Sequence, residues 1–99
     1  MARFDVHELK GRKDLVIDCQ ADLLDRLTTR FVVPLALESE APRPAARLNP
    51  TFKIGNRQYV MMTQFAAAIH LRELGPVTAS LRGEGTRIVD ALDLLITGI

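Results

Sequence analysis

The sequence predicts an α+β fold in which a small antiparallel β-sheet closes on itself and a C-terminal α-helix lies against it. Short segments of the first two thirds of the chain alternate apolar and polar residues, with turn-forming residues between them. Only the last segment repeats apolar residues at helical spacing. The chain has 99 residues, of which 47% are hydrophobic and 25% charged, and this suits one core. We therefore expect residues 1–99 to form a single domain.

The N-terminal segment has the pattern of two strands joined by a polar turn. Phe4 and Val6 alternate with polar neighbours, which predicts a strand over 3–8 with His7 on its solvent face. A glycine-containing polar turn follows at 10–14. Alternation resumes over 15–20 and predicts the second strand, after which the acidic residues at 22–25 indicate a loop.

The middle of the chain predicts a third strand and then an irregular stretch. Residues 29–34 are rich in β-branched and apolar side chains, as strands are. Pro34 has no N–H to donate, so we expect it at a sheet edge or at the end of this strand. From 38 to 50 the pattern dissolves into Glu, Ser, Pro, Arg and Ala, which predicts an exposed excursion without a regular element.

A further hairpin follows the excursion. Apolar residues alternate over 51–54 and continue over 58–63, on either side of the turn residues Gly55 and Asn56. The sheet is thus expected to have about five strands. The segment 64–79 fits either a helical turn or a further strand, broken at Gly75-Pro76, and its structure stays open.

The C-terminal segment predicts a helix over 84–97. Thr86 is expected to cap its start, and Gly98 stands where a helix ends in a left-handed residue. Its packing face is formed by apolar residues at helical spacing, namely Ile88, Leu92, Leu95 and Ile96.

Charge and cysteine content narrow the class of protein. The formal net charge of +1 is too small to drive non-specific binding to nucleic acid or to a membrane. The single Cys19 cannot form an internal disulfide, which is compatible with a reducing compartment. No apolar stretch is long enough for a signal peptide or a membrane span. We therefore expect a cytoplasmic protein without membrane contact.

Candidates for catalysis or metal binding are few. His7 and His70 are the only histidines, and with one cysteine they lack the spacing of a zinc site, so we expect neither a metal nor another cofactor. His70 is expected to be partly buried and hydrogen-bonded. Residues 41–72 contain bases and no acid, and this stretch either docks an acidic partner or a nucleic-acid backbone, or is a solvated face. Its bases are Arg43, Arg47, Lys53, Arg57 and Arg72.

Five ordered blocks of the chain resemble the CcdB toxins of toxin–antitoxin modules, and the resemblance runs essentially from end to end. The blocks are Val16 to Asp25, Arg30 to Leu35, Leu48-Asn49-Pro50 leading to Ile54-Gly55, Met61-Met62-Thr63, and Ile88 to Ile99. The resemblance implies an SH3-like antiparallel barrel with a C-terminal helix, in a homodimer that is not an enzyme.

The resemblance also implies partners. Such toxins bind the A subunit of DNA gyrase and trap its cleaved-DNA complex. A CcdA-like antitoxin neutralises them through an acidic, disordered segment, and operator DNA is bound only through the toxin–antitoxin complex. We expect the antitoxin on Arg43, Arg47, Lys53 and Arg57. The gyrase-binding residues carry over onto Ala21, Leu23, Leu24, Asp93, Ile96, Thr97, Gly98 and Ile99.

Two alternatives stay open. MazF-like toxins share the barrel and cleave RNA, and Arg30, Thr63 and Arg43 are the residues that could serve such a reaction. The family's closing motif is Trp-Gly-Ile, whereas this chain has Thr97 in place of the tryptophan. Because buried tryptophans often dominate interfaces, the other alternative is a degenerate toxin that keeps only dimerisation and antitoxin binding.

Overall fold

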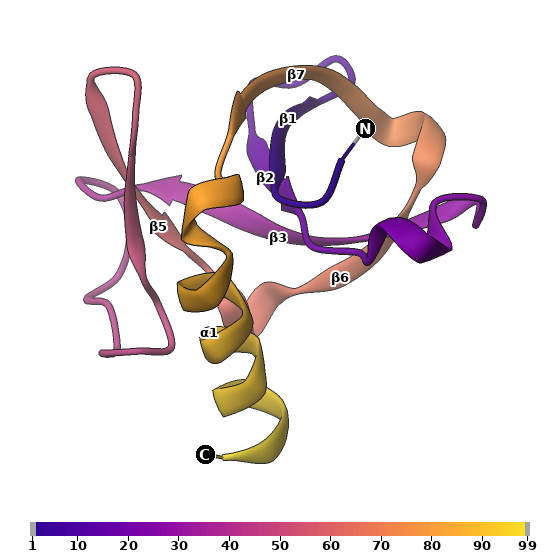
Figure 1. Cartoon of the computed structure of the whole chain (residues 1–99). Coiled ribbons are helices and arrows are strands. Elements are labelled where there is room, and N and C mark those ends of the chain that lie inside the picture. Colours follow the sequence, from indigo (N-terminus) through magenta and orange to yellow (C-terminus); the bar gives the residue numbers. More distant parts are fainter. Residues whose placement is uncertain (1, 99) are drawn as a thin grey trace.

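The computed structural model describes residues 2–98 and has the α+β architecture that the sequence predicts, a curled antiparallel sheet with a C-terminal helix (Figure 1). The strands are β1 (Asp5–Leu9), β2 (Leu15–Asp18), β3 (Thr29–Leu37), β4 (Thr51–Ile54), β5 (Arg57–Met61), β6 (Ala67–His70) and β7 (Leu74–Ser80). Four short 3-10 helices are η1 (Asp22–Leu24), η2 (Thr63–Phe65), η3 (Leu71–Glu73) and η4 (Arg82–Glu84), and the one α-helix of the described chain is α1 (Gly85–Thr97).

The long strand β3 organises the sheet. The strand order is β4-β5-β3-β2-β1-β7, and β6 pairs with β3 off this path. Thr29 to Val32 of β3 pair with β6, whereas Leu35 to Leu37 pair with β5. Strands β1, β2, β3, β6 and β7 thereby curl into a half-barrel, and the β4–β5 hairpin extends away from it (Figure 1).

Pro34 lies inside β3, although the sequence places it at an edge or a strand end. The strand continues through it to Leu37. The Pro34 carbonyl accepts from the Met62 N–H at 2.9 Å, on the side of β3 where the pairing partner changes from β6 to β5. In a strand, the nitrogen of a residue faces the same side as its carbonyl, so the missing N–H falls where no partner strand is paired.

The expectation of five strands is wrong, because the segment left open at 64–79 supplies β6 and most of β7, giving seven strands within residues 2–98. Gly75 and Pro76 do not end β7. The register between β1 and β7 shifts where they lie, and such an irregularity accommodates a proline. A Cβ at Gly75 would stand 2.7 Å from the Glu8 carbonyl oxygen, so the backbones approach closely there because the residue is glycine.

The central strands are covered on both faces. Val6, Ile17 and Val33 are register partners, and they pack toward Ile88 of α1. The opposite face forms the interior of the half-barrel, with Val16, Val32 and Leu74 as its buried apolar residues. His7 pairs with Val16 and is buried on this inner face, so the expectation that it faces solvent is wrong.

Helix α1 begins and ends within a residue of its predicted bounds. Its N-cap is Glu84, without a side-chain cap, so the expected role of Thr86 is not found. Gly98 has φ 76° and donates its N–H to the Leu94 carbonyl, as predicted for the helix end. Of the predicted packing face only the first half is buried, because the last turns of α1 project beyond the sheet (Figure 1).

Candidate partner-binding surface

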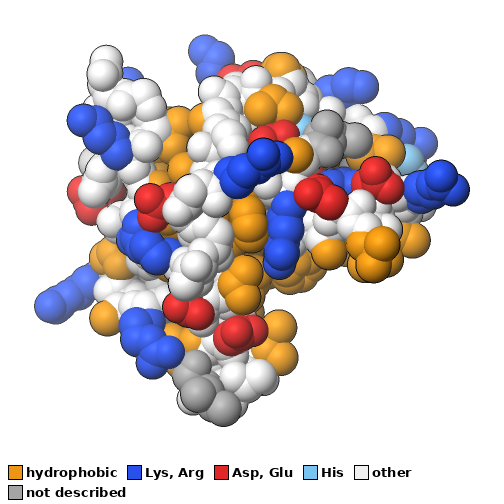
Figure 2. All heavy atoms as spheres, in the orientation of Figure 1, with side chains coloured by type: hydrophobic (Ala, Val, Ile, Leu, Met, Phe, Trp, Pro, Cys, Tyr) orange, Lys and Arg blue, Asp and Glu red, His pale blue; other side chains and the backbone are white. Residues whose placement is uncertain are grey.

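Exposed large apolar side chains are grouped at two places of the described chain. Leu23, Leu24 and Leu27, in and after η1, are 92%, 48% and 48% exposed. Leu95 and Ile96, at the end of α1, are 43% and 75% exposed. Single exposed leucines are common, but grouped ones mark interaction surfaces. Figure 2 shows apolar side chains beside the free end of α1 and again toward the side where η1 lies.

The η1 place contains Ala21, Leu23 and Leu24, three of the residues expected to contact gyrase. Every residue from Ala21 to Thr29 is exposed. The turn is closed by the Leu24 N–H, which donates to the Ala21 carbonyl at 2.9 Å. The Arg3 backbone N–H donates to Asp22 Oδ1 at 2.9 Å and ties the turn to the N-terminal segment. The leucine side chains therefore point into solvent from a turn that is held by its backbone and by polar contacts.

The end of α1 contains Asp93, Ile96, Thr97 and Gly98, all of which are exposed. The Thr97 hydroxyl donates to the Asp93 carbonyl at 2.6 Å, which closes the last helical turn. Ile99 lies outside the described residues. Thr97, at the position where the resemblance implies a tryptophan, therefore presents a small hydroxyl that is engaged with its own helix.

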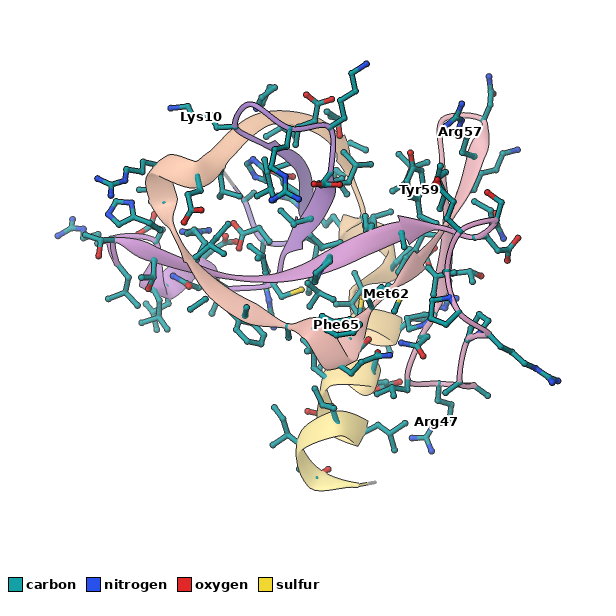
Figure 3. The ribbon with its side chains drawn as sticks, turned by 180° about the vertical axis from the view of Figure 1, so that it is seen from behind. Lys10, Arg47, Arg57, Tyr59, Met62 and Phe65 are labelled. Atoms are coloured by element: carbon teal, nitrogen blue, oxygen red, sulfur yellow. The ribbon has the colours of Figure 1, made fainter. Side chains whose placement is uncertain are left out.

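The two places do not meet within one copy of the chain. In Figure 1, η1 and the end of α1 stand apart, and β6 runs between them. Phe65 of η2 is 61% exposed, and η2 packs against α1 (Figure 3). Sequence reasoning missed Phe65, Leu27 and Leu95 as surface residues. Leu95 fits the apolar stripe of a helix, so only the length by which α1 outruns the sheet reveals that it is exposed.

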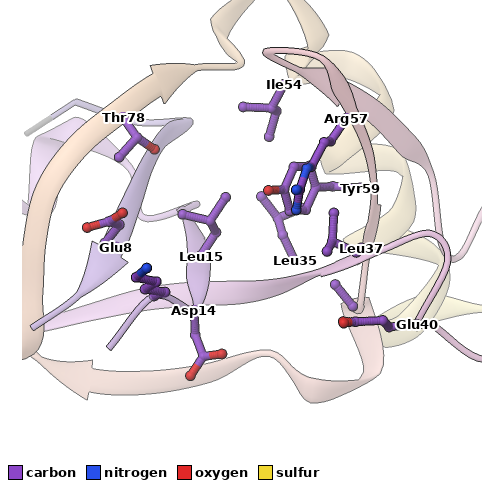
Figure 4. A pocket seen from close by; sticks show the side chains of 12 residues that line it. Glu8, Asp14, Leu15, Leu35, Leu37, Glu40, Ile54, Arg57, Tyr59 and Thr78 are labelled. Carbon is purple, nitrogen blue, oxygen red and sulfur yellow. The ribbon is translucent and has the colours of Figure 1, made fainter. Parts of the chain in front are cut away.

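The bases expected to bind the antitoxin are exposed but spread out. Figure 3 shows Arg57 and Arg47 at opposite ends of the region formed by the β4–β5 hairpin and the preceding excursion. Arg57 borders a groove of about 620 Å³ whose floor is apolar and whose rim also carries carboxylates (Figure 4). The stretch that is free of acids in the sequence thus meets acids in space. The charged residues of the groove are Glu8, Lys13, Asp14, Glu40 and Arg57.

The residues considered for RNA cleavage are inaccessible, with the exception of Arg43. Arg30 is fully buried, and its Nε and Nη2 donate to Asp18 Oδ2 at 3.1 and 2.5 Å. Thr63 is also fully buried, and its hydroxyl donates to the Leu48 carbonyl at 2.5 Å. His70 is exposed instead of partly buried, although its Nδ1 does accept from the Arg72 N–H. Arg30 and Thr63 therefore act within the fold, and neither can reach an RNA phosphate.

Buried Cys19 is protonated at neutral pH. Desolvation by burial, reinforced by the Asp18 carboxylate, raises the pKa of this thiol to about 12.

Among residues 2–98, no three His, Cys, Asp or Glu side chains are grouped as metal ligands would be. The described part of the chain has no helix of the length and apolar character needed to cross a membrane.

The comparison with protein families agrees with the curled sheet and the terminal helix. A family model described as CcdB protein matches residues 3–98, nearly the whole chain of 99 residues. The match includes the β1–β2 and β4–β5 hairpins, the η1 segment and all of α1. The chain therefore belongs to the CcdB family, whose members are toxins of toxin–antitoxin modules.

Proposed function

We propose that this toxin acts as a homodimer that binds the A subunit of DNA gyrase and holds gyrase in its cleaved-DNA complex. The observation that carries the proposal is the family match over residues 3–98 together with exposed apolar side chains at the carried-over positions. Leu23 and Ile96 are the most exposed large hydrophobic residues of the described chain. Burial of such side chains is the usual source of affinity between proteins.

The dimer is supported by what lies between the two exposed places. Strand β6 pairs with β3 and offers its other edge, flanked by the exposed Phe65. In a twofold dimer, each copy buries the same surface against the other. Such a dimer would cover both the open edge of β6 and the apolar side chain beside it. The η1 turn and the α1 end of both copies would then border one continuous surface for gyrase.

We also propose that an acidic antitoxin segment approaches the side of the molecule formed by the excursion and the β4–β5 hairpin. The bases there are exposed and can attract an acidic chain over a distance, which acts mainly on the rate of association. The residues concerned are Arg43, Arg47, Lys53 and Arg57.

The test is a gyrase assay with purified protein. Supercoiling of relaxed plasmid is followed in the presence of ATP, and linear DNA is counted after detergent and protease treatment. The wild type should inhibit supercoiling and accumulate linear DNA. Ile96→Asp should lose both effects, because it places a charge where an apolar contact is proposed. Val77→Asp, at an exposed position of β7 outside the proposed surface, is the matched control and should behave as the wild type.

An RNA-cleavage assay on the same samples tests the two alternatives, an RNA-cleaving toxin and a degenerate toxin. Cleavage of RNA would overturn the proposal and would require a site other than the buried Arg30 and Thr63. A protein that dimerises and binds its antitoxin but neither binds nor inhibits gyrase would be a degenerate toxin. The first substitution to test would then be Thr97, which stands in place of the family's tryptophan.

A further inference from the structure

The segment from Ala21 to Thr29, which carries the proposed gyrase contacts of η1, has no buried side chain to hold it. Its conformation must therefore depend on hydrogen bonds. We propose that Gln20 is the positioning residue of this surface: its side chain fixes the η1 turn, so that Leu23 and Leu24 are presented in one arrangement. This inference rests on the proposed function for its consequence at gyrase, although not for the structural role of Gln20.

Gln20 joins η1 to the sheet through both the nitrogen and the oxygen of its side-chain amide. Its Nε2 donates to the Leu24 carbonyl at 2.8 Å, and its Oε1 accepts from the Phe31 N–H at 2.9 Å. The residue is 8% exposed, so water competes little for these bonds. The Leu24 carbonyl also accepts from the Leu27 N–H at 3.2 Å, and this bond closes the end of the turn. By bonding to the same carbonyl, Gln20 fixes the orientation of that peptide group.

The half-barrel interior in turn holds Gln20. Asp18 is fully buried, and its Oδ1 accepts from the Gln20 N–H at 3.1 Å. Its other oxygen takes the two hydrogen bonds from Arg30, which fixes the carboxylate on both sides. Arg30, Asp18, Gln20 and Leu24 therefore form a continuous hydrogen-bonded path from the barrel interior to the exposed turn.

Such a path explains how a solvent-exposed turn can bind with little loss of conformational freedom. A partner that had to order the segment would lose affinity for every side chain it immobilised. Without Gln20, the Leu24 carbonyl and the Phe31 N–H lose their side-chain partners, and the turn opens to water. Loss of the positioning should thus weaken binding although Gln20 itself need not touch gyrase.

Two variants test the role of each hydrogen bond. Gln20→Met keeps the length of the side chain and removes both bonds. Gln20→Glu keeps an acceptor for the Phe31 N–H but removes the donor to Leu24. Gln58→Met, at an exposed position of β5, is the matched control for the same chemical change. Amide hydrogen exchange is measured at Leu24 and Leu27 and across β1 and β2, and affinity for the gyrase A subunit is measured in parallel.

For both Gln20 variants we expect exchange at Leu24 and Leu27 to rise about tenfold or more, and affinity for gyrase to fall by a similar factor. Exchange in β1 and β2 and the behaviour of Gln58→Met should match the wild type. Unchanged exchange at η1, or an equal rise in η1 and the strands, would overturn the positioning role. Faster exchange at η1 with unaltered gyrase affinity would also overturn it. A wild type that does not bind gyrase would refute the proposed function, and the exchange at η1 would still decide whether Gln20 holds the turn.

Discussion

Leu23 should be dispensable for folding and necessary for binding. Its side chain is 92% exposed, so Leu23→Ala removes almost no packing and should change the free energy of unfolding by less than about 0.5 kcal/mol. If gyrase buries this side chain, the three lost carbon atoms, at about 0.8 kcal/mol each, correspond to roughly 2 kcal/mol of binding free energy. The dissociation constant for the gyrase A subunit should therefore rise roughly 30-fold.

Leu81→Ala is the matched control, because Leu81 is 7% exposed and packs in the core on the α1 side of the sheet. The same truncation there should cost about 2 to 5 kcal/mol of stability. Urea denaturation gives the stability of both variants, and titration of folded protein into the gyrase A subunit gives the affinity. A Leu23→Ala protein that binds gyrase within twofold of the wild type, or that loses more than about 1 kcal/mol of stability, would refute the reasoning.

Other variants probe the interior, the helix end and the charged surface. Arg30→Met should destabilise the protein by about 3 to 5 kcal/mol in urea titrations, because it leaves the Asp18 carboxylate buried and unpaired; an unchanged midpoint would contradict this. Gly98→Ala should cost about 1 kcal/mol in thermal melts, since φ is 76° there and no atom within 4 Å obstructs a Cβ, so the penalty is conformational only. Cys19 should resist alkylation at neutral pH until the protein unfolds. Because burial raises the pKa of its thiol from 9.0 to about 12, its contribution to stability should be complete below pH 9 and be lost as the pH rises from 9 to 12. A Cys19→Ala variant with the same stability profile over that window would contradict this origin. Antitoxin association should slow as salt rises, and an unchanged rate would exclude docking on Arg43, Arg47, Lys53 and Arg57.

Patterns over a few neighbouring residues predicted much of the fold. The alternation over 15–20, the turn at Gly55 and Asn56, and the helical period before Gly98 each depend on residues close in sequence, and each element was found where its pattern lies. The α+β class follows from these elements alone. The family blocks likewise pointed to residues of η1 and of the end of α1, which the structure leaves exposed.

Other features depended on partners distant in sequence. The alternation in β1 predicts which residues share a face of the strand, but it does not predict what covers each face. In the structure, the half-barrel covers the face on which His7 lies. Pro34 can stay within a strand because the neighbour of β3 changes beside it. The apolar stripe of α1 is continuous in the sequence, and only the extent of the sheet leaves Leu95 and Ile96 exposed.

Outside 64–79, the sequence by itself therefore determined the kinds of element, their approximate bounds and the family, because propensity, period and turn chemistry act over a few residues. Tertiary structure alone decided which polar groups are interior. Arg30 is a candidate for RNA cleavage in the sequence, yet the pairing of β2 with β3 brings it against Asp18, and the curled sheet buries both side chains. The same pairing of β2 with β3 places Gln20 between β3 and η1, where one side-chain amide bonds to both Leu24 and Phe31. Burial is a property of the whole chain packed on itself, and the cost of burying a charge or an amide is met only by partners that packing brings near.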